Sequence, residues 1–489
     1  MTSGSERTAP TDALDAGDAG DRYIRGSVFR IVAYGLTALM SVAAVPLVIS
    51  HLGPVRYAYF ATASAVVLIA AGFTESGLNA YGLREWATGR PDREDFLRNL
   101  IGLRMSVTGF SIGCAAAGTA LIGAPKLLTL GMLASGAGLV LTLAGESYGI
   151  PINGDLKLGV AAGLTLIQQL TLTTTYVVLV LLNAGVVLLL AATLLSGLAL
   201  LLATGVAMHW RLVPIPTYDR SVWWETLKQT APYGLATAVG LLYFRESLIL
   251  VSVLSTSKQA GYFAASFKII EVLTTFPYQL VLAALPILAR AAHTRDSDRQ
   301  SYVSQKLVDT CVLLGAWASL SIVFGGPFGI DVVSRGDHQF APSVSMLEIQ
   351  GIAVFASFVV APYSSILLSM KRFWDLGKAN VAALVVVTVL SVALIPSLGG
   401  RGASIASVGA EFTLAAGYAF YLRRMRPEIT ITLRSVPRVA AVTAVAGLVT
   451  LALPGSSALH IAVFGVLYFG LAAAFRLIPV EILQAARRR

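Results

Sequence analysis

The chain has 489 residues, of which 56% are hydrophobic and only 13% are charged. Soluble domains contain about a quarter charged residues, so this composition excludes an ordinary soluble globular protein. The net charge of +10 requires no nucleic acid as partner, because basic residues at the ends of membrane spans face anionic lipid head groups.

The apolar residues come in blocks of about twenty, the length that a helix needs to cross about 30 Å of hydrocarbon. Blocks such as 186–207 lack the alternation of barrel strands, and backbone amides in lipid must be satisfied internally, so the blocks are helices. The sequence therefore predicts an all-α polytopic membrane protein with about fourteen transmembrane helices. In chain order the expected spans are 27–50, 57–81, 97–122, 127–149, 158–183, 186–208, 229–254, 259–289, 303–327, 344–369, 377–397, 401–422, 434–453 and 457–477.

The remaining segments divide these spans into two lobes. Residues 1–25 lack an apolar core and are rich in Gly, Ala, Ser and Asp, which predicts a disordered cytoplasmic tail and no signal peptide. Spans one to six form an N-terminal lobe, 26–208, and spans seven to twelve a C-terminal lobe, 229–425. Residues 209–228, with two prolines and two adjacent tryptophans, predict an interfacial cytoplasmic connector between the lobes. Residues 426–489 hold spans thirteen and fourteen and a basic end.

The basic residues predict the orientation of the chain. With the N-terminus in the cytoplasm, 29 of the 36 Lys and Arg residues fall at cytoplasmic ends and 5 at outer ends, and the last two, Arg245 and Lys268, lie inside spans. Cytoplasmic segments of membrane proteins carry such an excess. We therefore expect a multi-pass protein of the bacterial inner (plasma) membrane with both termini in the cytoplasm.

A short internal repeat supports the two-lobe plan. Residues 59–64, Tyr-Phe-Ala-Thr-Ala-Ser, align with residues 262–267, Tyr-Phe-Ala-Ala-Ser-Phe, and each segment opens the second span of its lobe. The two segments lie six spans apart, so they point the same way through the membrane. Parallel repeats of this kind are related by an axis along the membrane normal, with the substrate path between them.

Four ionisable residues lie near the middle of spans seven and eight: Arg245, Glu246, Lys268 and Glu271. A charge at mid-bilayer costs about 2.5–3.5 kcal/mol on insertion scales, so these side chains must face protein or water. Two interpretations remain open. Either Arg245–Glu246 and Lys268–Glu271 neutralise each other and hold the spans together, or the cations bind an anionic head group while the acids balance charge or carry a coupling ion.

A second charged set is expected toward the cytoplasmic mouth. It comprises Arg30, Arg84 and Arg104, which would attract an anionic head group, and Glu75, which would balance charge or couple ions. Arg30 and Arg84 could equally be interfacial anchors. The other buried acids, Glu146, Glu348 and Glu411, are each more typical of packing residues than of a site.

The sequence contains no catalytic motif. It has no phosphate-binding Gly-Lys-Ser/Thr loop, no Gly-x-Ser-x-Gly motif, and no metal-ligand spacing among its five histidines. We therefore expect no enzyme activity, no cofactor and no metal.

Several stretches resemble a known family. The first two spans contain Val45-Pro46-Leu47, Leu52-Gly53, Tyr57, Glu75-Ser76-Gly77-Leu78 and Arg84-Glu85, and this stretch resembles the start of the polysaccharide-biosynthesis flippases. The eighth span, with Gly261-Tyr262, Phe267-Lys268-Ile269-Ile270, Pro277 and Leu285-Pro286, resembles the eighth span of that family. Phe244-Arg245-Glu246 occupies the place of a charged pair that the family leads with an acid, whereas here Arg245 comes first.

The resemblance is to the oligosaccharide flippase branch of the multidrug/oligosaccharidyl-lipid/polysaccharide (MOP) exporter superfamily. It implies two six-helix lobes that rock about a central cavity, and a secondary transporter that moves an isoprenoid-pyrophosphate-linked oligosaccharide to the outer leaflet for surface polysaccharide biosynthesis. The partners implied are this lipid-linked substrate, membrane lipids, and the glycosyltransferases and polymerase of the same pathway. A drug or organic-cation antiporter of the same superfamily, and a membrane glycan polymerase or ligase, remain as alternatives.

Overall fold

The computed structural model describes residues 19–477 except 89–91, 156, 211–214, 295, 371, 430 and 433. Within these ranges a few side chains are not described, among them those of Arg30 and Glu75. The described residues contain helices and no strand, so the predicted all-α class is confirmed. Residues 1–18 of the predicted tail lie outside the described residues, and 19–25 already belong to the first helix.

The helices follow one another with short connections. The first group is α1 (Ala19–Ala87), α2 (Arg93–Leu121), α3 (Lys126–Tyr148), α4 (Ile150–Gly154), α5 (Leu158–Leu181) and α6 (Val186–Ala207). The second group is α7 (Arg220–Leu254), α8 (Ser257–Thr294), α9 (Ser297–Ser334), the short η1 (His338–Phe340), α10 (Ser343–Ser369), α11 (Phe373–Leu398) and α12 (Gly400–Met425). The chain ends with α13 (Ser435–Ala452) and α14 (Ser457–Ala474).

Each of the fourteen predicted spans coincides with a helix or with one arm of a helix. Spans one and two are the two arms of α1, which meet at Gly53, where φ is 64° and ψ is 174°. Only glycine adopts this backbone conformation without strain, so the chain turns back there with almost no loop. Among the described residues, twelve helices are long and apolar enough to cross a membrane, and this number counts α1 once although its two arms are two predicted spans. The number becomes thirteen when the bent helix α8 is included.

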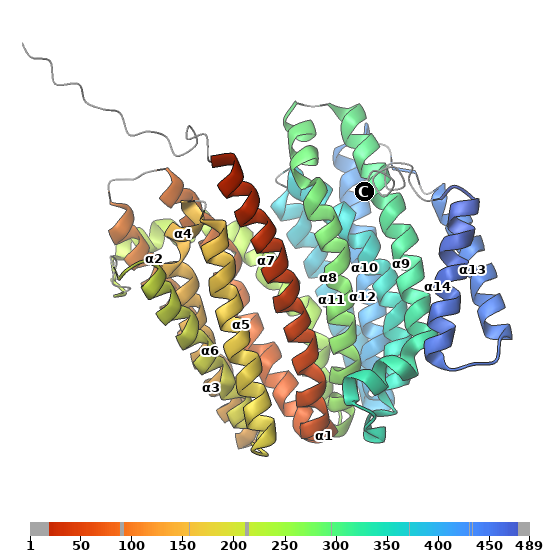
Figure 1. Ribbon diagram of the computed structural model, residues 1–489, viewed down its shortest axis with the longest axis horizontal. Helices are drawn as coiled ribbons and strands as arrows, with labels where there is room; N and C mark the ends of the chain where they lie inside the picture. The colour runs from red at the N-terminus through yellow and green to blue at the C-terminus, as the bar shows by residue number, and fades with distance from the viewer. Residues whose placement is uncertain are drawn as a thin grey trace, which may run out of the picture.

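The helices form two bundles (Figure 1). Figure 1 shows α2, α3, α5 and α6 on one side, α8 to α12 on the other, and the α13–α14 pair at the far edge beside α9. The arms of α1 and the helix α7 lie between the bundles, and α1 packs against both α7 and α8. One buried apolar cluster includes residues of α1, α3, α6, α8 and α10, so the core is continuous from one bundle to the other.

The helix α8 is bent, with one part ending at Leu282 and the next beginning at Ala284. Pro286 lies four residues after Leu282. A proline inside a helix lacks an N–H and its ring clashes with the carbonyl four residues earlier, which accounts for a bend at this position.

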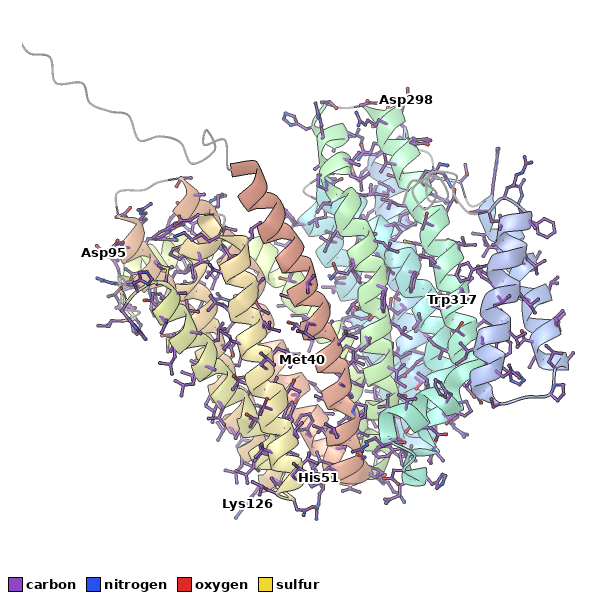
Figure 2. All side chains as sticks on the ribbon, viewed as in Figure 1. Met40, His51, Asp95, Lys126, Asp298 and Trp317 are labelled. Atoms are coloured by element: carbon purple, nitrogen blue, oxygen red, sulfur yellow. The ribbon has the colours of Figure 1, made fainter. Side chains whose placement is uncertain are left out.

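The chain alternates between two ends of the molecule, as a polytopic protein requires. Figure 2 shows Asp95 and Asp298 at one end and His51 and Lys126 at the opposite end. The sequence assigns the first end to the cytoplasm and the second to the outside. This assignment stays a prediction, as do the predicted domain boundaries. Of the predicted connector, 220–228 form the first turns of α7.

The two repeat segments, together with the turns that precede them, meet at the end predicted to be outer. The hydroxyl of Ser257, at the start of α8, donates to the hydroxyl of Tyr59 in α1 over 3.2 Å. Gly261 packs on the backbone of Pro54 so closely that a Cβ on Gly261 would overlap the Pro54 carbonyl. The bundles are therefore in backbone contact at this end.

Candidate functional site

Three of the four mid-membrane charges form one cluster, here called the charged cluster: Arg245, Lys268 and Glu271. The guanidinium of Arg245, from α7, donates to Glu271 Oε1, and Lys268 Nζ lies 2.7 Å from Glu271 Oε2. Lys268 and Glu271 are three residues apart on α8 and so share a helix face. One carboxylate therefore serves two cations, and the cluster carries a net charge of +1.

Glu246 does not pair with Arg245, contrary to the expected Arg245–Glu246 pair. Its Oε1 accepts a hydrogen bond of 2.6 Å from the Thr388 hydroxyl of α11. Consecutive residues of a helix point about 100° apart, so Arg245 and Glu246 face different neighbours. Of the four charges, Arg245, Lys268 and Glu271 therefore lie together between α7 and α8, and Glu246 lies apart from them. This leaves an excess of positive charge between the two helices.

The charged cluster is neither sealed nor fully exposed. The side chains of Arg245, Glu271 and Lys268 are 13%, 20% and 34% exposed. Tyr57, on the second arm of α1, is buried in the same apolar cluster as Phe267 and Ile270 of α8. The charged cluster therefore lies where α1 of one bundle meets α7 and α8 of the other.

Two aromatic rings separate the charged cluster from an inner cavity. The guanidinium carbon of Arg245 lies 5.9 Å from the ring centre of Phe244 and 6.0 Å from that of Phe267, within the range of a cation–π contact. The same two rings line a small cavity inside the second bundle. The aromatic pair is thus shared by the cluster and the cavity.

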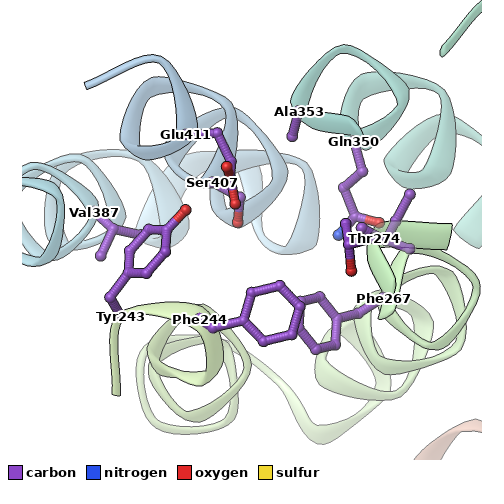
Figure 3. Close-up of a pocket in the computed structure, with 10 residues that line it drawn as sticks. Tyr243, Phe244, Phe267, Thr274, Gln350, Ala353, Val387, Ser407 and Glu411 are labelled. Atoms are coloured by element: carbon purple, nitrogen blue, oxygen red, sulfur yellow. The ribbon is translucent and has the colours of Figure 1, made fainter. Parts of the chain in front are cut away.

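This inner cavity is polar on two sides (Figure 3). Figure 3 shows Glu411 and Ser407 of α12 on one side and Gln350 of α10 with Thr274 of α8 on another, with Phe244 and Phe267 between them. Its volume of about 30 Å³ exceeds the roughly 10–15 Å³ that one water requires. Among the described residues, Glu411 Oε2 and both amide atoms of Gln350 have no hydrogen-bond partner. Buried polar atoms of this kind call for internal water.

Gln350 was missed by the sequence analysis, and Glu411 was assigned to packing. The indication that the sequence does give is that Gln350 is a polar residue inside a largely apolar helix of 27 residues. No sequence pattern indicates that Gln350 and Glu411, sixty residues apart, line one cavity.

Sequence comparison finds no matching family model and no matching curated protein. Solved structures do match in fold. The lipid II flippase MurJ, in an inward closed conformation, superposes with a TM-score of 0.73 and 12% identity, over 92% of this chain and 98% of MurJ. An inward-facing multidrug resistance MATE family transporter of the MOP superfamily gives 0.64 and 13%, over 85% of this chain and 98% of that one.

A MOP superfamily transporter from Pyrococcus furiosus superposes with a TM-score of 0.56 and 14% identity, over 87% of this chain and all of that one. All three solved structures are covered almost end to end, and the likeness extends over 85–92% of this chain. The chain has the MOP superfamily fold. The resemblance found in the sequence is thereby supported at the level of the fold.

Within this fold, Arg84 and Arg104, two of the residues predicted at the cytoplasmic mouth, lie in different surroundings. Arg84 is exposed, with its guanidinium 3.1 Å from Glu85 and 3.3 Å from Gln229 of α7, and it stacks at 5.0 Å on the Tyr81 ring. Arg84 therefore links the two bundles at the predicted cytoplasmic end. The side chains of Arg30 and Glu75 lie outside the described part of the structure.

Arg104, predicted at the cytoplasmic mouth, is buried inside the first bundle. Its side chain is 0% exposed and bonds the Ser147 hydroxyl at 2.8 Å and the Glu146 carboxylate at 3.5 Å, both on α3. It is thus buried between α2 and α3, because Glu146 and Ser147 offer it a polar site inside the first bundle. Its predicted part in attracting the substrate head group stays a prediction.

Proposed function

We propose that the chain is a flippase that moves an isoprenoid-pyrophosphate-linked oligosaccharide from the cytoplasmic to the outer leaflet for surface polysaccharide biosynthesis. The observation that carries the proposal is the charged cluster. Two cations share one carboxylate at the junction of the bundles, which leaves a net charge of +1. A pyrophosphate compensates such a site, whereas an organic cation is repelled by it.

Residue roles follow from this geometry. Arg245 and Lys268 bind the pyrophosphate or acidic sugars when the substrate enters between the bundles. Glu271 neutralises them when the site is empty, so that neither cation is left unpaired in the membrane, where each would cost about 2.5–3.5 kcal/mol. Glu246, held by Thr388, is set apart from the pair and is a candidate for the coupling ion.

The fold supports this proposal. MurJ, which superposes over most of both chains, is described as a lipid II flippase. The MATE relatives of the same fold keep the drug or cation antiporter open as a second candidate. The positive charge of the cluster weighs against a cationic substrate.

The glycan polymerase or ligase alternative needs a working outer loop, for which the turn between α9 and α10 is the candidate. Asp337 there accepts the backbone N–H of Gln339 at 3.0 Å and caps η1, and Arg335 ends α9 in the left-handed conformation. These two residues therefore have roles in shaping the turn.

A reconstituted assay tests the proposal. Proteoliposomes with a fluorescent isoprenoid-pyrophosphate-linked oligosaccharide are treated with an impermeant quencher, and the protected fraction reports translocation. Arg245→Ala and Lys268→Ala should each abolish translocation while the protein remains inserted and abundant. Lys258→Ala, in the predicted outer turn between α7 and α8, is the matched control and should leave the rate unchanged.

Normal translocation by both cluster variants would refute the proposal. Uptake of a cationic dye by the same proteoliposomes, lost in Glu246→Gln, would instead support the antiporter.

A further inference from the structure

A groove separate from the charged cluster lies between α7 and α11. It has a volume of about 260 Å³. Its lining is apolar and aromatic apart from one lysine: Leu235, Val239, Phe373, Trp374, Gly377, Lys378 and Val381. The groove therefore combines an apolar trough with a single cation.

The two helices create the groove by their sequence. At Gly240 they approach closely, since a Cβ there would lie 3.2 Å from Asn380 Nδ2 of α11. Nearer to the start of α11, Gly377 has no side chain that could fill the space beside Val239 of α7. The groove thus lies beside the first two turns of α11, at the end of the molecule predicted to be cytoplasmic.

The groove faces away from the other bundle. On α7, Thr230 and Leu241 contact α1, at Gly77 and Gly72 respectively. Leu235 and Val239 lie roughly 120–180° around the helix from these contacts, at 3.6 residues per turn. Since α7 contacts α1 through the opposite face, the groove opens to the surrounding membrane and not to the junction that holds the charged cluster.

The lysine at the groove is exposed and only weakly paired. The Lys378 side chain is 62% exposed, with Nζ 4.0 Å from Asp375, while Arg372 holds the same carboxylate at 2.8 Å. Two cations again share one acid, so the rim of the groove carries a net positive charge. Trp374, exposed one turn before Lys378, has the position and chemistry of an interfacial anchor.

We propose that the groove is a binding site for one anionic phospholipid of the cytoplasmic leaflet. The acyl chain lies along Leu235, Val239 and Val381, and the phosphate lies beside Lys378. The groove volume of about 260 Å³ far exceeds the roughly 10–15 Å³ that one water requires, so the groove has room for part of an acyl chain.

Native mass spectrometry of the full chain tests this proposal. The purified protein is exchanged into delipidating detergent, titrated with phosphatidylglycerol or phosphatidylcholine, and the number of retained lipids is counted. The wild type should retain one more phosphatidylglycerol than phosphatidylcholine. Lys378→Gln should weaken that phosphatidylglycerol about fivefold, the equivalent of roughly 1 kcal/mol for one basic residue at an anionic surface.

Lys157→Gln is the matched control. Lys157 also precedes a transmembrane helix at the predicted cytoplasmic end, is 59% exposed and lies 3.4 Å from an aspartate, but it flanks no part of the groove. This variant should retain the wild-type number of lipids.

Two further variants test the apolar trough. Val239→Phe and Gly377→Leu each fill the groove, and each should remove the additional phosphatidylglycerol. Unchanged retention in both filled variants would overturn the proposal, as would equal retention of the two lipids by the wild type. A dimer that dissociates when the groove is filled would also overturn it, because the occupant would then be a second copy of the chain.

Discussion

At the scale of single residues, the charged cluster is defined by unequal numbers of acids and bases. Glu271 accepts from both Arg245 and Lys268, while Glu246 turns to Thr388. The sequence predicted that the charges of spans seven and eight would lie at one depth. It could not predict the partners, because the rotation of each helix about its own axis depends on packing against α1 and α11.

Removal of the shared carboxylate should destabilise the protein. Glu271→Gln leaves Arg245 and Lys268 facing each other, and we expect a loss of about 1–3 kcal/mol, the range for hydrogen bonds to charged groups. The double variant Lys268→Gln/Glu271→Gln should recover part of that loss, since it removes one of the repelling cations. Unfolding in a denaturing detergent measures the stability of the single variants and of the double variant. The contrary result would be a loss of stability in the double variant that exceeds the sum of the losses in the two single variants.

Another residue-scale prediction concerns Asp219, which precedes α7 and lies outside the spans. Its carboxylate accepts from the Ser221 hydroxyl at 2.8 Å and from the amides of Ser221 and Val222, and these hydrogen bonds hold the pKa of Asp219 below its usual value. A lowered folded-state pKa gives stability that is present above the unfolded pKa, about 3.9, and lost as pH falls through the folded value. Any excess stability of wild type over Asp219→Asn at neutral pH should therefore shrink on acidification toward pH 3. A difference that grows on acidification would contradict this role.

At the scale of elements, the contact between the repeat segments closes one end of the molecule. The tight turn at Gly53 and the start of α8 bring Pro54 against Gly261, and Ser257 against Tyr59. Backbone-to-backbone packing of this kind tolerates no added side chain. In the proposed transport cycle this contact opens and closes, and the lack of a side chain at Gly261 would permit its closure.

Gly261→Val should keep the predicted outer end open. The test is alkylation of a cysteine introduced at Ser257 by an impermeant maleimide in whole cells, with Cys114 and Cys311 replaced. Labelling should be faster in the Gly261→Val background than in the parent. Gly113→Val is the matched control, because Gly113 also lies inside a helix and a Cβ there meets nothing within 4 Å. Equal labelling in all three backgrounds would show that the contact does not gate this end.

At the scale of the whole molecule, much of the fold was predictable because lipid imposes a simple rule: apolar blocks of span length must be helices. Each predicted span corresponds to helix, and the superfamily resemblance agrees with the structural neighbours. The burial of Arg104 between α2 and α3, and the cavity shared by Gln350 and Glu411, were not predictable. Both depend on contacts between helices that are distant in sequence, and hydropathy contains no information about these contacts.

The proposed function requires that the charged cluster faces a passage in which its positive charge meets an anionic substrate. The most direct test combines accessibility and charge at Lys268. In a chain without Cys114 and Cys311, Lys268→Cys is treated with a small methanethiosulfonate that adds either an ammonium or a sulfonate, and translocation of the pyrophosphate-linked oligosaccharide is then measured. We predict that Lys268→Cys is inactive, that the ammonium reagent restores translocation and that the sulfonate reagent does not. Full activity of untreated Lys268→Cys, or equal rescue by both reagents, would contradict the account.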